Sequence, residues 1–95
     1  YNDMDLYNEM LPTLNRVNGE ENVNFMNAIT GAEDFSFFQE KVPGMYFFIG
    51  GAKKGTDPNL AAPHHTPDFY VDDSAMVTGL KSMTSLTLDY LQNNK

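Results

Sequence analysis

The chain has two histidines, His64 and His65, which stand side by side in the segment Pro-His-His-Thr-Pro. Neutral imidazole is the commonest nitrogen donor to zinc, manganese and similar ions, so His65, which begins the His-Thr-Pro sequence, is the candidate metal ligand. Pro67 restricts Thr66 to extended backbone, and an extended segment holds its side chains at fixed angles. Neighbouring side chains of such a segment point to opposite sides, so the two histidines are not expected to chelate one ion. A hydrogen-bonded surface histidine is the commoner alternative on spacing alone.

Two pairs of adjacent carboxylates are the other groups that could carry chemistry, Glu33 with Asp34 and Asp72 with Asp73. In a cleft, such groups bind a metal ion or act as a general base. Glu33 and Asp34, however, stand at the start of a predicted helix, and Asp72 and Asp73 come directly before another. Carboxylates at that position cap the first turn and offset the helix dipole. Residue types and spacing therefore favour helix capping for both pairs.

The element that must position these groups is the apolar run at residues 45–49, which has no charge. It is typical of a strand that is buried on both faces, as in the middle of a parallel sheet. Gly50 and Gly51 end this strand, where the backbone must turn or let another group approach. Ligands collect outside the carboxyl ends of strands in open α/β sheets. The strand, the two glycines and the histidine loop therefore form the candidate site.

Helices are expected on both sides of this strand, so the sequence predicts an α/β fold with a small sheet and flanking helices. Pro12 is expected to kink the first helix or to divide it into two. Thr30 and Glu33 have the spacing of a capping box for the second helix. The predicted helices cover residues 2–18, residues 32–41 and a last stretch from about residue 74 that carries Met76, Leu80, Met83 and Tyr90 at helical spacing; short extended segments are predicted at residues 23–26 and 69–71.

Length and composition limit the classes of function. The 95 residues make at most one small domain, with an ordinary soluble composition of 41% hydrophobic and 20% charged residues. No apolar run approaches the roughly 20 residues that span a bilayer. The net charge of −7 disfavours nucleic-acid binding, and the lack of cysteine removes thiol chemistry and disulfides. Cytoplasmic, periplasmic and secreted locations all stay open.

Three blocks, taken together, resemble the C-terminal part of the M20 family of metallopeptidases. They are Gly-Ala-Glu-Asp-Phe-Ser at residues 31–36, Val-Pro-Gly at residues 42–44 with the following strand and Gly50, and His-Thr-Pro-Asp-Phe at residues 65–69 with Asp72-Asp73. The closest subgroup is the amidohydrolases that cleave N-acyl amino acids, hippurate and auxin conjugates. The order and spacing of the blocks match over nearly the whole chain.

The resemblance implies that residues 1–95 are the C-terminal portion of a catalytic domain, a three-layer α/β/α sandwich of the zinc-peptidase type. It implies two divalent metal ions in the intact site (zinc, manganese, cobalt or nickel), with His65 as the last protein ligand. Glu33, Asp34 and Gly50 carry over only as outer-shell or cleft-lining residues, and no role carries over to His64. The remaining ligands, the general-base glutamate and a lid domain would lie outside the chain.

The function implied is metal-assisted hydrolysis of the amide bond of N-acyl amino acids or small peptides, with no nucleic-acid or membrane partner. The chain alone is expected to be inactive, because one ligand does not hold an ion tightly. A homodimer of the parent enzyme is compatible with the family. The alternatives are a free-standing, non-catalytic α/β module for ligand or protein binding, and an acidic surface that recruits a basic partner.

Overall fold

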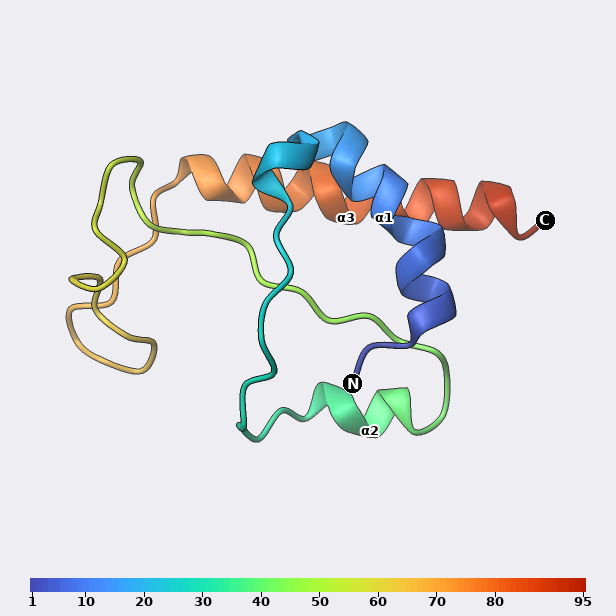
Figure 1. Ribbon diagram of the computed structural model, residues 1–95, viewed down its shortest axis with the longest axis horizontal. Helices are drawn as coiled ribbons and strands as arrows, with labels where there is room; N and C mark the ends of the chain where they lie inside the picture. The colour runs from blue at the N-terminus through green and yellow to red at the C-terminus, as the bar shows by residue number, and fades with distance from the viewer.

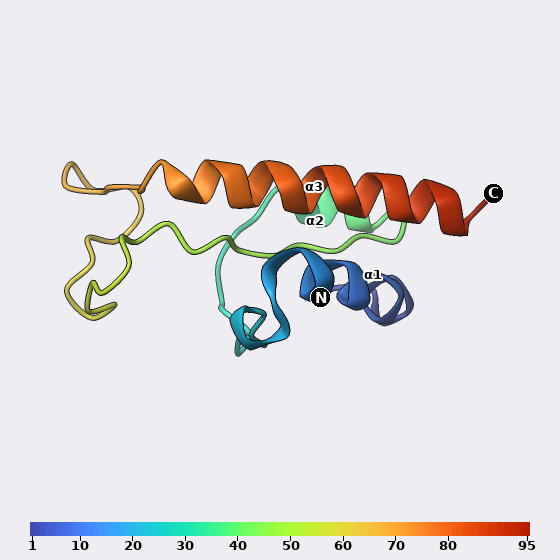
Figure 2. The same ribbon diagram turned by 90° about the horizontal axis from the view of Figure 1, so that it is seen from above.

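A computed structural model describes all 95 residues and contains four helical elements. They are α1 (Met4–Asn18), the short 3₁₀ helix η1 (Glu20–Asn22), α2 (Phe35–Gln39) and α3 (Ser74–Asn93). No β-strand is present, so the predicted α/β fold with a small sheet is wrong for this chain. Figure 2 shows α3 running along the molecule with α1 against it, and the other segments loop around this pair. None of the helices is long and apolar enough to cross a membrane.

Helix α1 forms where the sequence predicts it, because its signals are local. The side chain of Asp3 caps it by accepting a hydrogen bond from the backbone N–H of Leu6 at 2.9 Å. Gly19 ends the helix at a φ of 84°, a conformation that favours glycine. Pro12 lies inside the helix, which stays continuous although its axis bends in Figure 1. The bend is the effect expected of a residue that lacks an N–H and clashes with the preceding turn.

The core lies between α1 and α3 and is small. Met10, Leu14 and Leu86 are the only buried apolar side chains, and four half-buried residues pack against them: Leu6, Val23, Met45 and Phe47. Burial of these side chains stabilises the contact between the two helices. The two helices therefore dock through a narrow apolar contact.

Polar side chains fix the register of this contact. Asp89 on α3 accepts hydrogen bonds at 2.6 Å from the Thr13 hydroxyl and from the Arg16 guanidinium on α1. The Thr13 hydrogen bond, followed by that of Arg16, holds the pKa of the Asp89 carboxyl below its usual range. About two turns away on α3, the hydroxyl of Ser82 accepts a hydrogen bond from the Asn18 amide at 3.1 Å, and Ser82 is only 2% exposed. A shift of one helix along the other would break both sets of bonds.

Residues 45–49 show why the predicted strand does not form. Their side chains alternate as in a strand, with Met45 and Phe47 packed on the core and Tyr46 and Phe48 exposed on the other side. Pairing is missing, because residues 47–50 neither donate nor accept a backbone hydrogen bond. Only Tyr46 is held, since its backbone exchanges two hydrogen bonds with the Asn2 side chain at 2.8 and 2.9 Å. Local sequence gives the alternation, but a strand also needs a second segment beside it.

Helix α2 is shorter than predicted, covering Phe35–Gln39 rather than residues 32–41. The expected capping box is absent, because the Glu33 carboxylate accepts a hydrogen bond from the N–H of Phe35 at 3.2 Å and not from Thr30. The Gln39 amide donates to the carbonyl of Gly44 at 2.9 Å. This bond closes the turn that leads into residues 45–49. With no core beneath it to bury its phenylalanines, this helix stays at a single turn.

Helix α3 begins where the acidic pair predicts. Asp72 accepts hydrogen bonds from both the hydroxyl and the backbone N–H of Ser74, and these bonds lower the pKa of the Asp72 carboxyl. Asp73, the N-cap residue, makes no side-chain cap bond, and the first turn of the helix carries no acidic residue. The capping interpretation of the pair therefore holds only for Asp72, which satisfies the first N–H of the helix.

Candidate functional site

The histidine loop is a compact turn in which His65 has left-handed backbone. The Thr66 hydroxyl donates to the carbonyl of Pro63 at 2.7 Å, and the N–H of Phe69 donates to the carbonyl of Thr66 at 3.1 Å. These bonds close the turn around His65, whose φ is 63°. The prediction of extended backbone at His65 is therefore wrong. Pro67 restricts only the residue directly before it, and histidine is one of the residues that tolerates a left-handed conformation.

The imidazole of His65 is exposed and makes no hydrogen bond or ion pair within the chain. The chain has no group of three or more His, Cys, Asp or Glu side chains that together could hold a metal ion. Glu33, Asp34 and His65 therefore do not come together in one cluster. An accessible, unengaged imidazole fits the role of one donor in a larger set, and the metal role of His65 stays a prediction.

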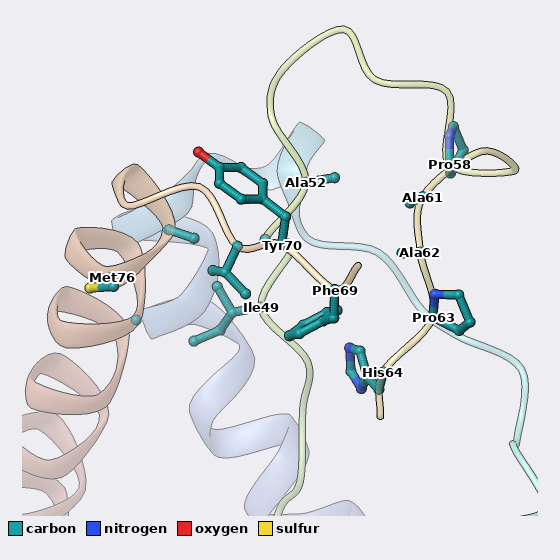
Figure 3. Close-up of a pocket in the computed structure, with 14 residues that line it drawn as sticks. Ile49, Ala52, Pro58, Ala61, Ala62, Pro63, His64, Phe69, Tyr70 and Met76 are labelled. Carbon is teal, nitrogen blue, oxygen red and sulfur yellow. The ribbon is translucent and has the colours of Figure 1, made fainter. Parts of the chain in front are cut away.

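His64 lines a mainly apolar pocket, where it lies next to Phe69 in Figure 3, and its side chain is exposed, as that of His65 is. Its ring meets the ring of Phe69 edge to face, with centroids 4.7 Å apart, whereas the centroids of the two histidine rings are 6.5 Å apart. His65 does not line this pocket. The two imidazoles therefore lie in different surroundings, and the expectation that they do not bind one ion together stays a prediction. The sequence predicts no role for His64, and its place on the pocket depends on packing between segments that are far apart in the chain.

The pocket measures about 600 Å³, which lies within the usual range for small-ligand sites. Three stretches meet there: the end of the 45–51 segment, the long loop before the histidines, and the first turns of α3. The N–H of Asp72 donates to the carbonyl of Gly51 at 2.8 Å and ties two of these stretches together. The lining is mainly apolar and contains one imidazole, that of His64, and one phenol, that of Tyr70; its members are Ile49, Gly51, Ala52, Pro58, Ala61, Ala62, Pro63, His64, Phe69, Tyr70, Val71, Ala75, Met76 and Gly79.

A side chain at position 51 would crowd Val71, whereas one at position 50 would not. A Cβ built on Gly51 would lie 3.1 Å from a methyl group of Val71, whereas a Cβ on Gly50 would meet nothing within 4 Å. Gly50 stands between two lining residues but does not itself line the pocket. The close approach that the glycine pair predicts therefore occurs at Gly51 and not at Gly50. The cleft-lining role expected of Gly50 stays a prediction.

Glu33 contacts the exposed face of residues 45–49. Its carboxylate accepts a hydrogen bond from the Tyr46 hydroxyl at 3.2 Å, in addition to the one from the N–H of Phe35. The bond to Glu33, followed by the repulsion between the two negative charges, raises the pKa of Tyr46. Asp34 precedes α2 without a side-chain cap bond. Both carboxylates are exposed, and neither takes part in a pocket with the histidines.

Comparison with known proteins shows the family to which the chain belongs. The profile of peptidase family M20/M25/M40 matches residues 1–89, so the chain belongs to this family. No solved structure matches the chain at a significant level.

Three relatives with similar sequences have names that describe hydrolases. An "IAA-amino acid hydrolase ILR1-like 4" of Arabidopsis thaliana is 37% identical over 73 residues, which cover 77% of this chain and 16% of that protein. "Thermostable carboxypeptidase 2" of Saccharolobus solfataricus is 39% identical over 64 residues, covering 65% of this chain and 15% of the relative. A Bacillus subtilis protein, YhaA, named as an amidohydrolase, is 29% identical over 85 residues, or 90% and 21% of the two chains. The chain thus spans about a fifth or less of each of these relatives.

Proposed function

We propose that residues 1–95 are the C-terminal portion of the catalytic domain of a metal-dependent hydrolase that cleaves the amide bond of N-acyl amino acids or small peptides. The observation that carries the proposal is the family match over residues 1–89, which includes the His-Thr-Pro-Asp-Phe block. The names of the relatives support this substrate class, because one is a hydrolase of IAA–amino acid conjugates and another is a carboxypeptidase.

His65 would contribute one nitrogen donor to a site of two divalent ions. Its exposed ring and its hydrogen-bonded turn favour this role, since a donor must be accessible and held in place. Divalent ions, when bound, supply Lewis acidity toward an amide carbonyl and toward water. The other donors, the general base and a lid domain would come from polypeptide outside residues 1–95. Glu33, Asp34 and Gly50 would line the cleft or orient the donors.

The test uses the full polypeptide that contains these residues. We expect His65→Ala to reduce both the bound metal and the hydrolysis of N-acyl amino acids by more than the roughly 10- to 100-fold that loss of an outer-shell partner costs. His64→Ala is the matched control: it removes the adjacent imidazole and should leave the metal content unchanged. Unchanged activity of His65→Ala at limiting metal would overturn the proposal.

A second candidate is non-catalytic binding of a small apolar ligand by the chain itself, which the apolar pocket beside His64 favours. Titration with an aromatic carboxylate such as benzoate, followed by NMR of the two imidazoles, distinguishes the candidates. A saturable shift of the His64 resonances without any metal requirement would support binding. No shift on His64 would exclude it.

A further inference from the structure

One asparagine of the chain is followed directly by glycine, and it is Asn18, the last residue of α1. In a flexible chain, the backbone nitrogen of such a glycine attacks the side-chain carbonyl carbon of the asparagine. A C–N bond forms and closes a succinimide ring, and the side-chain nitrogen leaves as ammonia with the proton of the backbone N–H. Water then opens the ring to aspartate or isoaspartate, so the reaction needs no other reagent. Glycine favours the attack because it has no side chain to crowd its nitrogen.

The folded structure holds the Asn18 amide away from this attack. Its nitrogen donates to the carbonyl of Leu14 at 3.0 Å and to the hydroxyl of Ser82 at 3.1 Å. The same hydroxyl lies 3.3 Å from the amide oxygen of Asn18. The bond to Leu14 directs the amide toward the start of α1, whereas the nitrogen of Gly19 lies beyond its end. The carbon that would be attacked therefore faces away from the attacking atom.

The attacking nitrogen is held as well. The N–H of Gly19 donates to the carbonyl of Asn15 at 2.8 Å, and a hydrogen-bonded N–H gives up its proton less readily. The backbone carbonyl of Asn18 accepts a hydrogen bond from the Asn22 amide at 2.8 Å, which fixes the peptide group that joins Asn18 to Gly19. Ring closure therefore requires the end of α1 to unwind. It also requires the Asn18 amide to leave Ser82, which belongs to α3 and is 2% exposed, so α1 must move off α3.

The product of the reaction does not fit the docked arrangement. A carboxylate at position 18 has no N–H to donate to the carbonyl of Leu14, so two acceptor oxygens would face each other. It would also lie at the negative end of the helix dipole, beside Glu20 and Glu21. Only the hydroxyl of Ser82 could still bond to it, as a donor. Isoaspartate adds a methylene group to the backbone and shifts the end of the helix further.

We propose that Asn18 is a deamidation site that the contact between α1 and α3 protects, and that its conversion to aspartate or isoaspartate prevents α1 from docking again. The contact protects the site because Asn18 of one helix is held by Ser82 of the other. A separation of the helices that is reversible at first becomes irreversible once the ring has closed. The inference is independent of the proposed function, since neither residue lines the pocket beside His64.

The rate of deamidation in the full polypeptide tests the protection. The protein is incubated in buffer and in urea, and trypsin then releases the peptide of residues 17–41 for mass spectrometry. We expect position 18 to deamidate at least about tenfold more slowly in the native state than in urea, because ring closure must wait for local opening. Ser82→Ala removes the bond between the helices and should raise the native rate by about two- to tenfold. Ser85→Ala is the matched control on α3, because the Ser85 hydroxyl makes no hydrogen bond, and it should leave the rate unchanged.

Equal rates in buffer and in urea would overturn the proposal, and so would equal native rates for Ser82→Ala and Ser85→Ala. A lack of deamidation at position 18 in urea would overturn it too, because the site would then be unreactive. Circular dichroism shows whether each variant folds. Ser82→Cys takes the place of Ser82→Ala if the latter does not fold, since a thiol has a similar size and bonds only weakly.

The effect of the product is tested with Asn18→Asp, which carries the aspartate form from the start. Asn24→Asp is its control, because it adds the same charge to an exposed loop. Hydrogen exchange of the α1 backbone is measured by mass spectrometry in both full-length variants. We expect α1 to exchange at least about threefold faster in Asn18→Asp than in Asn24→Asp. Equal exchange would overturn the claim that the product prevents docking.

Discussion

Leu86 and Leu88 form a matched pair for testing the packing of α3. They are the same residue type on the same helix, two positions apart, but Leu86 is 8% exposed and Leu88 is 61% exposed. Leu86 packs in the core with Met10 and Leu14 of α1, whereas the side chain of Leu88 is exposed to solvent. Truncating each to alanine therefore removes the same atoms from two opposite environments.

The expected magnitudes follow from burial. Removing a buried leucine side chain costs about 2–5 kcal/mol, and Leu86→Ala should fall near the lower end because a core of three residues can partly collapse. Leu88→Ala should change the free energy of unfolding of the chain by no more than about 0.5 kcal/mol. The free energy of unfolding of a domain of this length is roughly 5–14 kcal/mol. Because the core of this chain is so small, its free energy of unfolding should lie at or below the lower value. Leu86→Ala should therefore separate α1 from α3.

The assay is urea denaturation of residues 1–95 and of both variants, followed by far-UV circular dichroism. Leu86→Ala should lower the transition midpoint or remove the cooperative transition, and Leu88→Ala should follow the parent curve. Equal shifts for the two variants would refute the assigned orientation of α3.

Two further predictions concern titratable groups. The pKa of Asp89 is lowered in the folded chain by Thr13 and Arg16, so its stabilising contribution is present above its ordinary pKa of about 4 and is lost as the pH falls through the lowered value. Asp89→Asn should therefore destabilise the chain at neutral pH and make its stability less sensitive to acid, as measured by urea denaturation at several pH values. The pKa of Tyr46 is raised by Glu33, so Glu33→Gln should return this pKa toward 10.0. Ultraviolet titration of the phenolate measures the pKa, and Tyr46→Phe assigns the signal. An unchanged pKa in Glu33→Gln would contradict the prediction.

The helices α1 and α3 were predictable because their information is local. The cap at Asp3, the glycine at position 19 and the carboxylate before Ser74 lie within a few residues of the turns that they stabilise. Residues 45–49 were mispredicted for the opposite reason. Their apolar side chains and their alternation are local properties, but strand formation depends on pairing with a distant segment, and no segment pairs with them here.

The candidate site divides in the same way. His65 is identified by its sequence block, but its left-handed backbone depends on hydrogen bonds from Thr66 and Phe69 that no periodicity predicts. The position of His64 on the pocket and the contact between Glu33 and Tyr46 need the chain to fold back over many residues. No pattern in the sequence indicates either of them.

The backbone conformation of His65 also restricts how this position can evolve. At a φ of 63°, β-branched residues are strongly disfavoured, and glycine, asparagine and aspartate are the main substitutes for histidine. Glycine would keep the turn but provide no side-chain donor. Aspartate would keep both the turn and an oxygen atom that binds divalent ions. Drift at position 65 in a functional lineage should therefore pass from histidine to aspartate far more readily than to glutamine or cysteine, which supply a donor atom but strain the turn.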